Sequence, residues 1–77
     1  MLHYNLHKNN YKLYDLYDKY NTFLKTGTLY ELSYYIIKIN PTRFIYSKDE
    51  HRIHSSLYHA TRVKSKPYGY YIKENKK

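Results

Sequence analysis

Tyrosine places the strongest constraint on the fold, because 13 of the 77 residues are tyrosine and aliphatic side chains are few. A tyrosine ring supplies a large apolar surface, but its hydroxyl needs a hydrogen-bond partner when it is buried. A chain of 77 residues also lies near the lower size at which a domain stabilises itself. We therefore expect one small domain over residues 1–77, with a shallow core and several tyrosine rings at the surface.

The positive charge is spread unevenly along the chain. The formal net charge is +8, of which residues 1–40 carry +2 and residues 41–77 carry +6. Such asymmetry predicts an acidic partner for the C-terminal half, most simply a phosphate backbone. The alternative is a charge that only keeps the protein in solution.

The composition also excludes several classes of protein. Because the chain has no cysteine, disulfides and thiolate metal sites are excluded. No apolar run approaches the roughly 20 residues that span a bilayer, and the N-terminus has no secretory signal. We therefore expect a cytoplasmic protein without a membrane partner. Heavy use of Lys, Asn, Ile and Tyr with almost no Ala is typical of AT-rich coding and fits a mobile genetic element.

The N-terminal third has helical spacing. Asn10 can cap a helix start, and Gly27 is placed to end the helix. The spacing predicts a helix over residues 10–25, preceded by a loose arm at residues 1–9. Tyr17 and Tyr20 would then belong to the core. The apolar residues on the predicted inner face are Leu13, Leu16, Tyr17, Tyr20 and Leu24.

The segment from Thr28 to Glu31, "TLYE", is a capping box and predicts a helix over residues 29–39. Its inner side would hold Leu29, Leu32, Ile36 and Ile39, and Pro41 would stop it. The alternative is a hairpin, because "YYIIKI" is rich in β-branched and aromatic residues and "NPTR" could turn back into "RFIY".

A second capping box, "SKDE" at residues 47–50, predicts a third helix. Ile53, Leu57 and Ala60 share one sector of that helix. The opposite side would hold Lys48, His51, Arg52, Ser55, His59 and Arg62. Beyond it, Tyr68, Tyr70 and Ile72 alternate with other residues as in a short strand, and residues 74–77 form a solvated basic tail.

This order of elements, and "RIHSSLYHATRVKSKPYGYYI" above all, resembles the winged helix-turn-helix domains of small phage and mobile-element replication or regulatory proteins. The resemblance implies a mainly α fold, with a winged-helix-like three-helix core and a small β-ribbon. The alternative is an α+β fold in which an N-terminal helix packs on a short antiparallel sheet. In that family the second helix of the pair enters the major groove and the ribbon lies on the backbone. The resemblance implies that Arg52, Ser55, His59 and Arg62 face DNA and that Lys64, Lys66 and Tyr68 belong to the wing.

Catalytic and metal chemistry finds little support. The five histidines have few carboxylates nearby and no cysteine, so a complete zinc shell is hard to build. Only two glycines are present, which leaves no Gly-rich phosphate loop. We expect no enzymatic activity, no metal and no cofactor.

The expected function is therefore non-enzymatic nucleic-acid binding, with DNA favoured over RNA, as an accessory component of a replication or regulatory complex of a mobile element. Its nucleic-acid-binding residues would be Lys48, Arg52, Ser55, His59, Arg62, Lys64, Lys66 and Tyr68. The alternative is a small obligate subunit or inhibitor of a larger polymerase, primase or nuclease, docked through Tyr34, Tyr35, Tyr58 and Tyr71. A third possibility is an α+β hairpin protein of a ribonucleoprotein particle.

Overall fold

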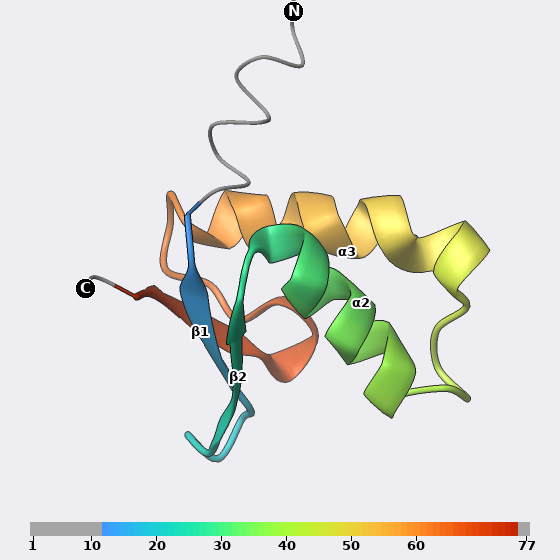
Figure 1. The fold of residues 1–77 in the computed structure, drawn as a ribbon, viewed down its shortest axis with the longest axis horizontal. Helices are drawn as coiled ribbons and strands as arrows, with labels where there is room; N and C mark the ends of the chain where they lie inside the picture. Colours follow the sequence, from blue (N-terminus) through green and yellow to red (C-terminus); the bar gives the residue numbers. More distant parts are fainter. Residues whose placement is uncertain (1–11, 76–77) are drawn as a thin grey trace, which may run out of the picture.

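The computed structural model describes residues 12–75, which form two α-helices packed on a three-stranded antiparallel sheet (Figure 1). The fold is therefore α+β. The arm predicted at residues 1–9 and the last two residues of the predicted tail lie outside this part of the chain. In chain order the elements are β1 (Tyr14–Tyr17), β2 (Phe23–Gly27), α2 (Leu29–Ile39), α3 (Tyr46–Ala60), the short 3-10 helix η1 (Pro67–Gly69) and β3 (Tyr71–Glu74).

The helix predicted over residues 10–25 is wrong for the described residues of that range, which form the hairpin β1–β2. In β1 the side chains alternate between the two faces of the sheet. Tyr14 and Leu16 are buried in the core, whereas Asp15 and Tyr17 are only partly buried. Alternation of this kind is the two-residue period of a strand, and it replaces the helical face inferred from the sequence.

The turn between β1 and β2 is held by Asp18. Its Oδ1 accepts hydrogen bonds from the backbone N–H groups of Tyr20 and Thr22, at 2.8 and 2.9 Å. Asn21 has a φ of 67°, a left-handed conformation that Asn adopts more readily than most residues. This turn carries Tyr20 out into solvent with 76% of its surface exposed, so the prediction that Tyr20 lies in the core is wrong.

The last strand, β3, pairs with the central strand β1 and forms one edge of the sheet. β3 runs antiparallel to β1 and pairs Tyr71 with Tyr17, so the strand order is β2-β1-β3. The strand begins at Tyr71 and not at Tyr68, because η1 occupies residues 67–69. The expected three-helix core and separate ribbon are thus replaced by two helices and a shared sheet in residues 12–75. Glu74, expected in the tail, instead ends β3, and Asn75 after it donates hydrogen bonds to Leu13 and Asp15.

Helix α2 forms as predicted, and its capping box is present. Its inner side differs at one position, because Ile39, predicted to face inward, is 42% exposed and Ile37 is buried instead. The Oγ1 of Thr28 accepts a hydrogen bond from the N–H of Glu31 at 3.2 Å, and Glu31 Oε1 accepts one from the N–H of Thr28 at 2.8 Å. Gly27 precedes this helix and does not end an earlier one. A Cβ at Gly27 would lie 2.7 Å from Oε1 of Glu31, so glycine leaves room for the capping carboxylate.

Helix α3 also forms, but the second predicted capping box does not. The N-cap is Ile45, which offers no side-chain hydrogen bond. The carboxylate of Asp49 accepts the N–H of Ile45 at 2.8 Å instead. As predicted, Ile53 and Leu57 face the core, where both are fully buried.

The core lies between the helices and one face of the sheet. Tyr14 is the one tyrosine among the buried hydrophobic residues of the described chain, so most rings stand at the surface or its margin. No helix within residues 12–75 is long and apolar enough to cross a membrane. The buried hydrophobic residues are Tyr14, Leu16, Leu29, Leu32, Ile36, Ile37, Phe44, Ile53, Leu57 and Ile72.

Candidate nucleic-acid interface

The solvent-facing side of α3 carries four of the eight residues predicted to bind nucleic acid. Burial of Ile53 and Leu57 turns the opposite side of the helix outward, because successive residues are rotated by about 100°. From Lys48 to His59 this side runs for about 16 Å. We call the α3 stripe the exposed residues Lys48, Arg52, Ser55 and His59 of this side, together with the exposed Arg62 in the turn that follows the helix.

One cation of the α3 stripe already has a partner. The guanidinium of Arg52 pairs with Asp49, the only ion pair found among residues 12–75. The backbone N–H of Ile45, followed by Arg52, holds the pKa of Asp49 below its ordinary value. The side chain of Arg52 remains 63% exposed, so it stays accessible to a phosphate. Lys48 and Arg62 carry the unpaired charge of the stripe.

The end of α3 opens into a hollow of about 510 Å³, which we call the basic hollow. Arg62 and Lys64 lie there together with Lys12 and Lys73, which come from the two ends of the described chain. Sequence reasoning missed the last two because only the pairing of β1 with β3 brings them near α3. The full lining is Lys12, Tyr14, Tyr58, Ala60, Thr61, Arg62, Lys64, Ser65, Tyr71, Ile72, Lys73 and Glu74.

Two residues assigned to the wing lie apart from the α3 stripe. Lys66 lines a separate hollow beside β1 and β3. Tyr68 packs edge-on against Phe44, with 5.2 Å between ring centroids, and the guanidinium of Arg43 lies over both rings. Tyr68 therefore braces the connection between the helices, and the structure does not group it with the other predicted nucleic-acid ligands.

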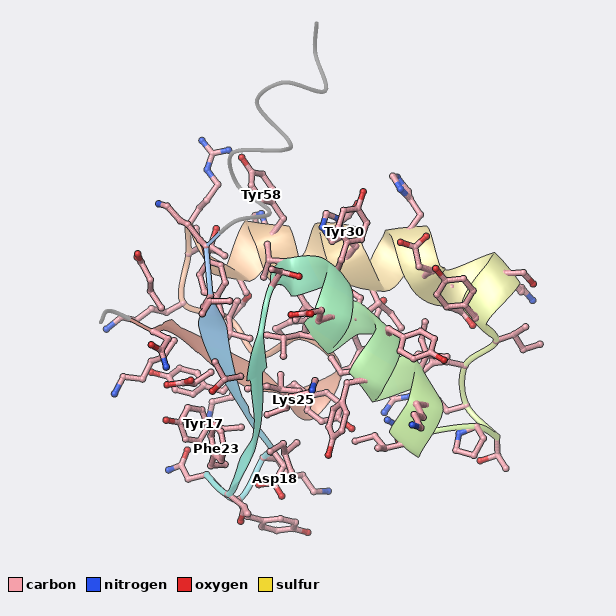
Figure 2. All side chains as sticks on the ribbon, viewed as in Figure 1. Tyr17, Asp18, Phe23, Lys25, Tyr30 and Tyr58 are labelled. Carbon is pink, nitrogen blue, oxygen red and sulfur yellow. The ribbon has the colours of Figure 1, made fainter. Side chains whose placement is uncertain are left out.

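The four tyrosines predicted to bind a protein do not form one face. Tyr34 and Tyr35 line a hollow of about 550 Å³ beside α2 and the start of α3, which we call the tyrosine hollow. Tyr58 lies further along α3 (Figure 2), and Tyr71 lies on β3. The lining of the tyrosine hollow is Lys25, Tyr30, Glu31, Tyr34, Tyr35, Lys38, Tyr46 and Glu50.

The histidines of α3 have different environments. His51 and His59 are exposed, whereas His54 stacks on Tyr30 with 4.3 Å between ring centroids. The Nε2 atom of His54 is buried and has no hydrogen-bond partner within residues 12–75. Burial lowers the pKa of His54 and so favours the neutral ring. No cluster of three or more metal-binding side chains is found in the same part of the chain.

The outer face of the sheet holds a polar group and an aromatic group. Asp15 accepts hydrogen bonds from Asn75 and from Thr26, which keep the pKa of its carboxyl below the ordinary value. Beside it, the ring of Tyr17 contacts Phe23 and Tyr71. Sequence reasoning missed this aromatic group because it placed Tyr17 in the core of a helix. The alternation of "YDLY" was the available signal.

This chain matches no known protein family, and no curated protein or solved structure matches it. Its function is therefore inferred from the arrangement of its own side chains.

Proposed function

We propose that this protein is a non-enzymatic DNA-binding protein that lays α3 in the major groove. It would act in the cytoplasm as an accessory component of a replication or regulatory complex of a mobile element. The carrying observation is the α3 stripe, in which every residue is exposed and the four residues on the helix lie opposite the fully buried Ile53 and Leu57. The major groove of DNA is about 12 Å wide and admits an α-helix.

The order of the C-terminal elements supports a winged-helix-like relation. Helix α2, a short connection and α3 follow one another, and η1 and then β3 come after them in the chain. In winged helix-turn-helix domains the second helix of such a pair reads the groove. Here the hairpin β1–β2 would take the place of the first helix.

The residues of the α3 stripe would divide the work of binding. Lys48, Arg52 and Arg62 would neutralise phosphates, which position the protein on the duplex. Ser55 and His59 lie between them along the helix and would reach base edges. Beyond the helix, the basic hollow would follow the backbone with Lys64 and Lys73.

The test measures binding of a labelled DNA duplex by fluorescence anisotropy at several salt concentrations. Affinity should fall steeply between about 50 and 200 mM salt. Lys48→Glu and Arg62→Glu should each weaken binding about tenfold or more and reduce the slope of log affinity against log salt by about 1. Lys38→Glu makes the same charge change at an exposed residue of α2 and is the matched control.

A loss of affinity of equal size in all three variants would show that binding depends only on net charge, and would sink the proposal. Binding without salt dependence would do the same. An RNA duplex of the same sequence should bind more weakly, because its deep, narrow major groove does not admit the helix.

The tyrosine hollow favours a second function, docking on a larger polymerase, primase or nuclease. Tyr30, Tyr34 and Tyr46 are 46%, 55% and 51% exposed there, and such rings are preferred anchors of protein interfaces. If this function is correct, Tyr34→Ala should abolish co-purification with such an enzyme and leave duplex binding unchanged. Retained co-purification would refute it.

A further inference from the structure

The outer face of the sheet is not covered by the helices. α2 contacts β2 and α3 contacts β3, and the core side chains of the strands, such as Leu16 and Ile72, all point to that inner side. The opposite face carries Tyr17 on the central strand. Tyr17 is only partly buried, and it lines a hollow on this side.

Three aromatic rings cross this face, one from each strand. Phe23 of β2 and Tyr71 of β3 are both register partners of Tyr17. The ring centroids of Tyr17 and Phe23 are 5.8 Å apart, and those of Tyr17 and Tyr71 are 5.9 Å apart. We call these three residues the aromatic row. Figure 2 shows Tyr17 and Phe23 together, well away from Tyr30 and Tyr58 on the helical side.

Phe23 contributes little to the core, because 53% of its surface is exposed. Its ring has no polar atom that could offset this exposure to water. Its edge contact with Tyr17 is a cross-strand aromatic pair, and the exposed part of the ring is left available to another flat ring.

The charge beside the aromatic row is positive. A hollow of about 360 Å³ adjoins it, lined by Tyr17, Asn21, Lys66, Tyr71 and Lys73. Both charged residues of this lining are cations. Asp15 shares the face: its Oδ1 accepts hydrogen bonds from Thr26 and Asn75, and its register partner Lys73 offsets its charge. Rings flanked by lysines are the combination that holds single-stranded nucleic acid, with bases stacked and phosphates neutralised.

We propose that the aromatic row stacks unpaired bases of single-stranded DNA. The path to it begins at α3, because Tyr71 and Lys73 line both this hollow and the basic hollow that contains Arg62. A strand leaving a duplex on the α3 stripe would cross the basic hollow and reach Tyr71. The inference extends the proposed function to a junction of duplex and single strand.

The test compares two probes on the intact protein: a labelled oligothymidylate of about 12 nucleotides and a labelled duplex. Phe23→Ala and Tyr71→Ala should each weaken binding of the oligothymidylate at least about fivefold. Phe23→Ala, which lies outside the basic hollow, should leave duplex affinity within about twofold. Tyr71→Phe, which keeps the ring, should bind like the unchanged protein. Tyr34→Ala, which removes an equally exposed ring on α2, is the control.

An abasic oligonucleotide of the same length separates stacking from phosphate binding. Its affinity for the protein should be lower than that of oligothymidylate. That affinity should be the same for the unchanged protein and for every variant. Circular dichroism tests whether each variant is folded. Phe23→Ala should disturb the fold less than Tyr71→Ala, because Phe23 is more exposed.

The proposal is overturned if Phe23→Ala and Tyr71→Ala retain full affinity for oligothymidylate, or if the unchanged protein does not bind that probe at low salt. It is also overturned if Phe23→Ala loses duplex affinity in the same ratio. Failure of the proposed function is a different result, because it is the loss of duplex binding or of its dependence on Lys48 and Arg62.

Discussion

Single residues decide which aromatic and titratable groups of this protein are available to a partner. His54 is the clearest case, because it lies on the basic helix α3 but its ring is stacked on Tyr30 and its Nε2 atom is buried. Burial, with His51 in the same direction, lowers the pKa of His54 against the opposing effect of Glu50. His54 is therefore a neutral packing residue, whereas His51 and His59 remain at the surface.

This environment predicts a pH dependence of stability. Because the pKa of His54 is lower in the folded than in the unfolded chain, the unfolded state binds more protons as pH falls below about 6.5. The midpoint temperature of thermal unfolding should therefore decrease as the pH is lowered from about 7.5 to about 5.5. His54→Phe keeps a stacked ring and removes the titration, so its midpoint should fall less. Thermal scans monitored by circular dichroism measure the difference.

The matched control is His59→Phe, which alters an exposed histidine of the same helix and should keep the original pH dependence. If His54→Phe lost as much stability on acidification as the unchanged protein, the buried ring would not be the cause.

At the scale of the element, helix starts depend on hydrogen bonds that similar sequences do not always make. "TLYE" and "SKDE" both have the pattern of a capping box. The first makes both reciprocal bonds between Thr28 and Glu31. The second does not, because α3 begins before Ser47 and Asp49 turns back to the N–H of Ile45.

Thr28 and Ser47 should therefore contribute differently to the free energy of unfolding. Thr28→Ala removes the side chain that accepts the Glu31 N–H and should lower the free energy of unfolding by about 1 kcal/mol. Ser47→Ala removes no cap and should change it by less than about 0.5 kcal/mol. Urea unfolding of both variants checks this. Equal losses would mean that the capping bonds of α2 are not the source of its stability.

At the scale of the whole molecule, a small core supports a large basic surface. The described residues include ten buried hydrophobic side chains, and two of them, Ile53 and Leu57, lie on the helix that carries the α3 stripe. The position of the cations thus depends on the same helix face that closes the core. A chain of this size has a small free energy of unfolding, so the loss of one core contact should destabilise the whole fold.

Truncation of one core side chain should remove a large part of that reserve. Ile53 is fully buried, so Ile53→Ala should cost about 2–5 kcal/mol of unfolding free energy. Ile45→Ala makes the same change at a site that is 59% exposed and should cost far less. Chemical denaturation compares the two. A similar cost at both sites would contradict the position of the core.

Sequence reasoning identified the helices better than the strands. The inner residues of α2 and α3 recur within one element, so their spacing can be recognised locally. The hairpin was missed because Leu13, Leu16, Tyr17, Tyr20 and Leu24 also fit a helix. The competing signals were the alternation in residues 14–17 and the turn around Asp18, whose hydrogen bonds only the structure displays.

The sequence by itself determined the two helices, the solvent-facing cations of α3 and the excess of surface tyrosine. These features depend on residues within about four positions of each other, because the helical repeat fixes which of them share a face. Only the tertiary structure decided that β3 pairs with β1, and with it the basic hollow and the aromatic row. That pairing joins Tyr17 to Tyr71 across the whole described chain, and local preferences do not specify a contact between segments so far apart.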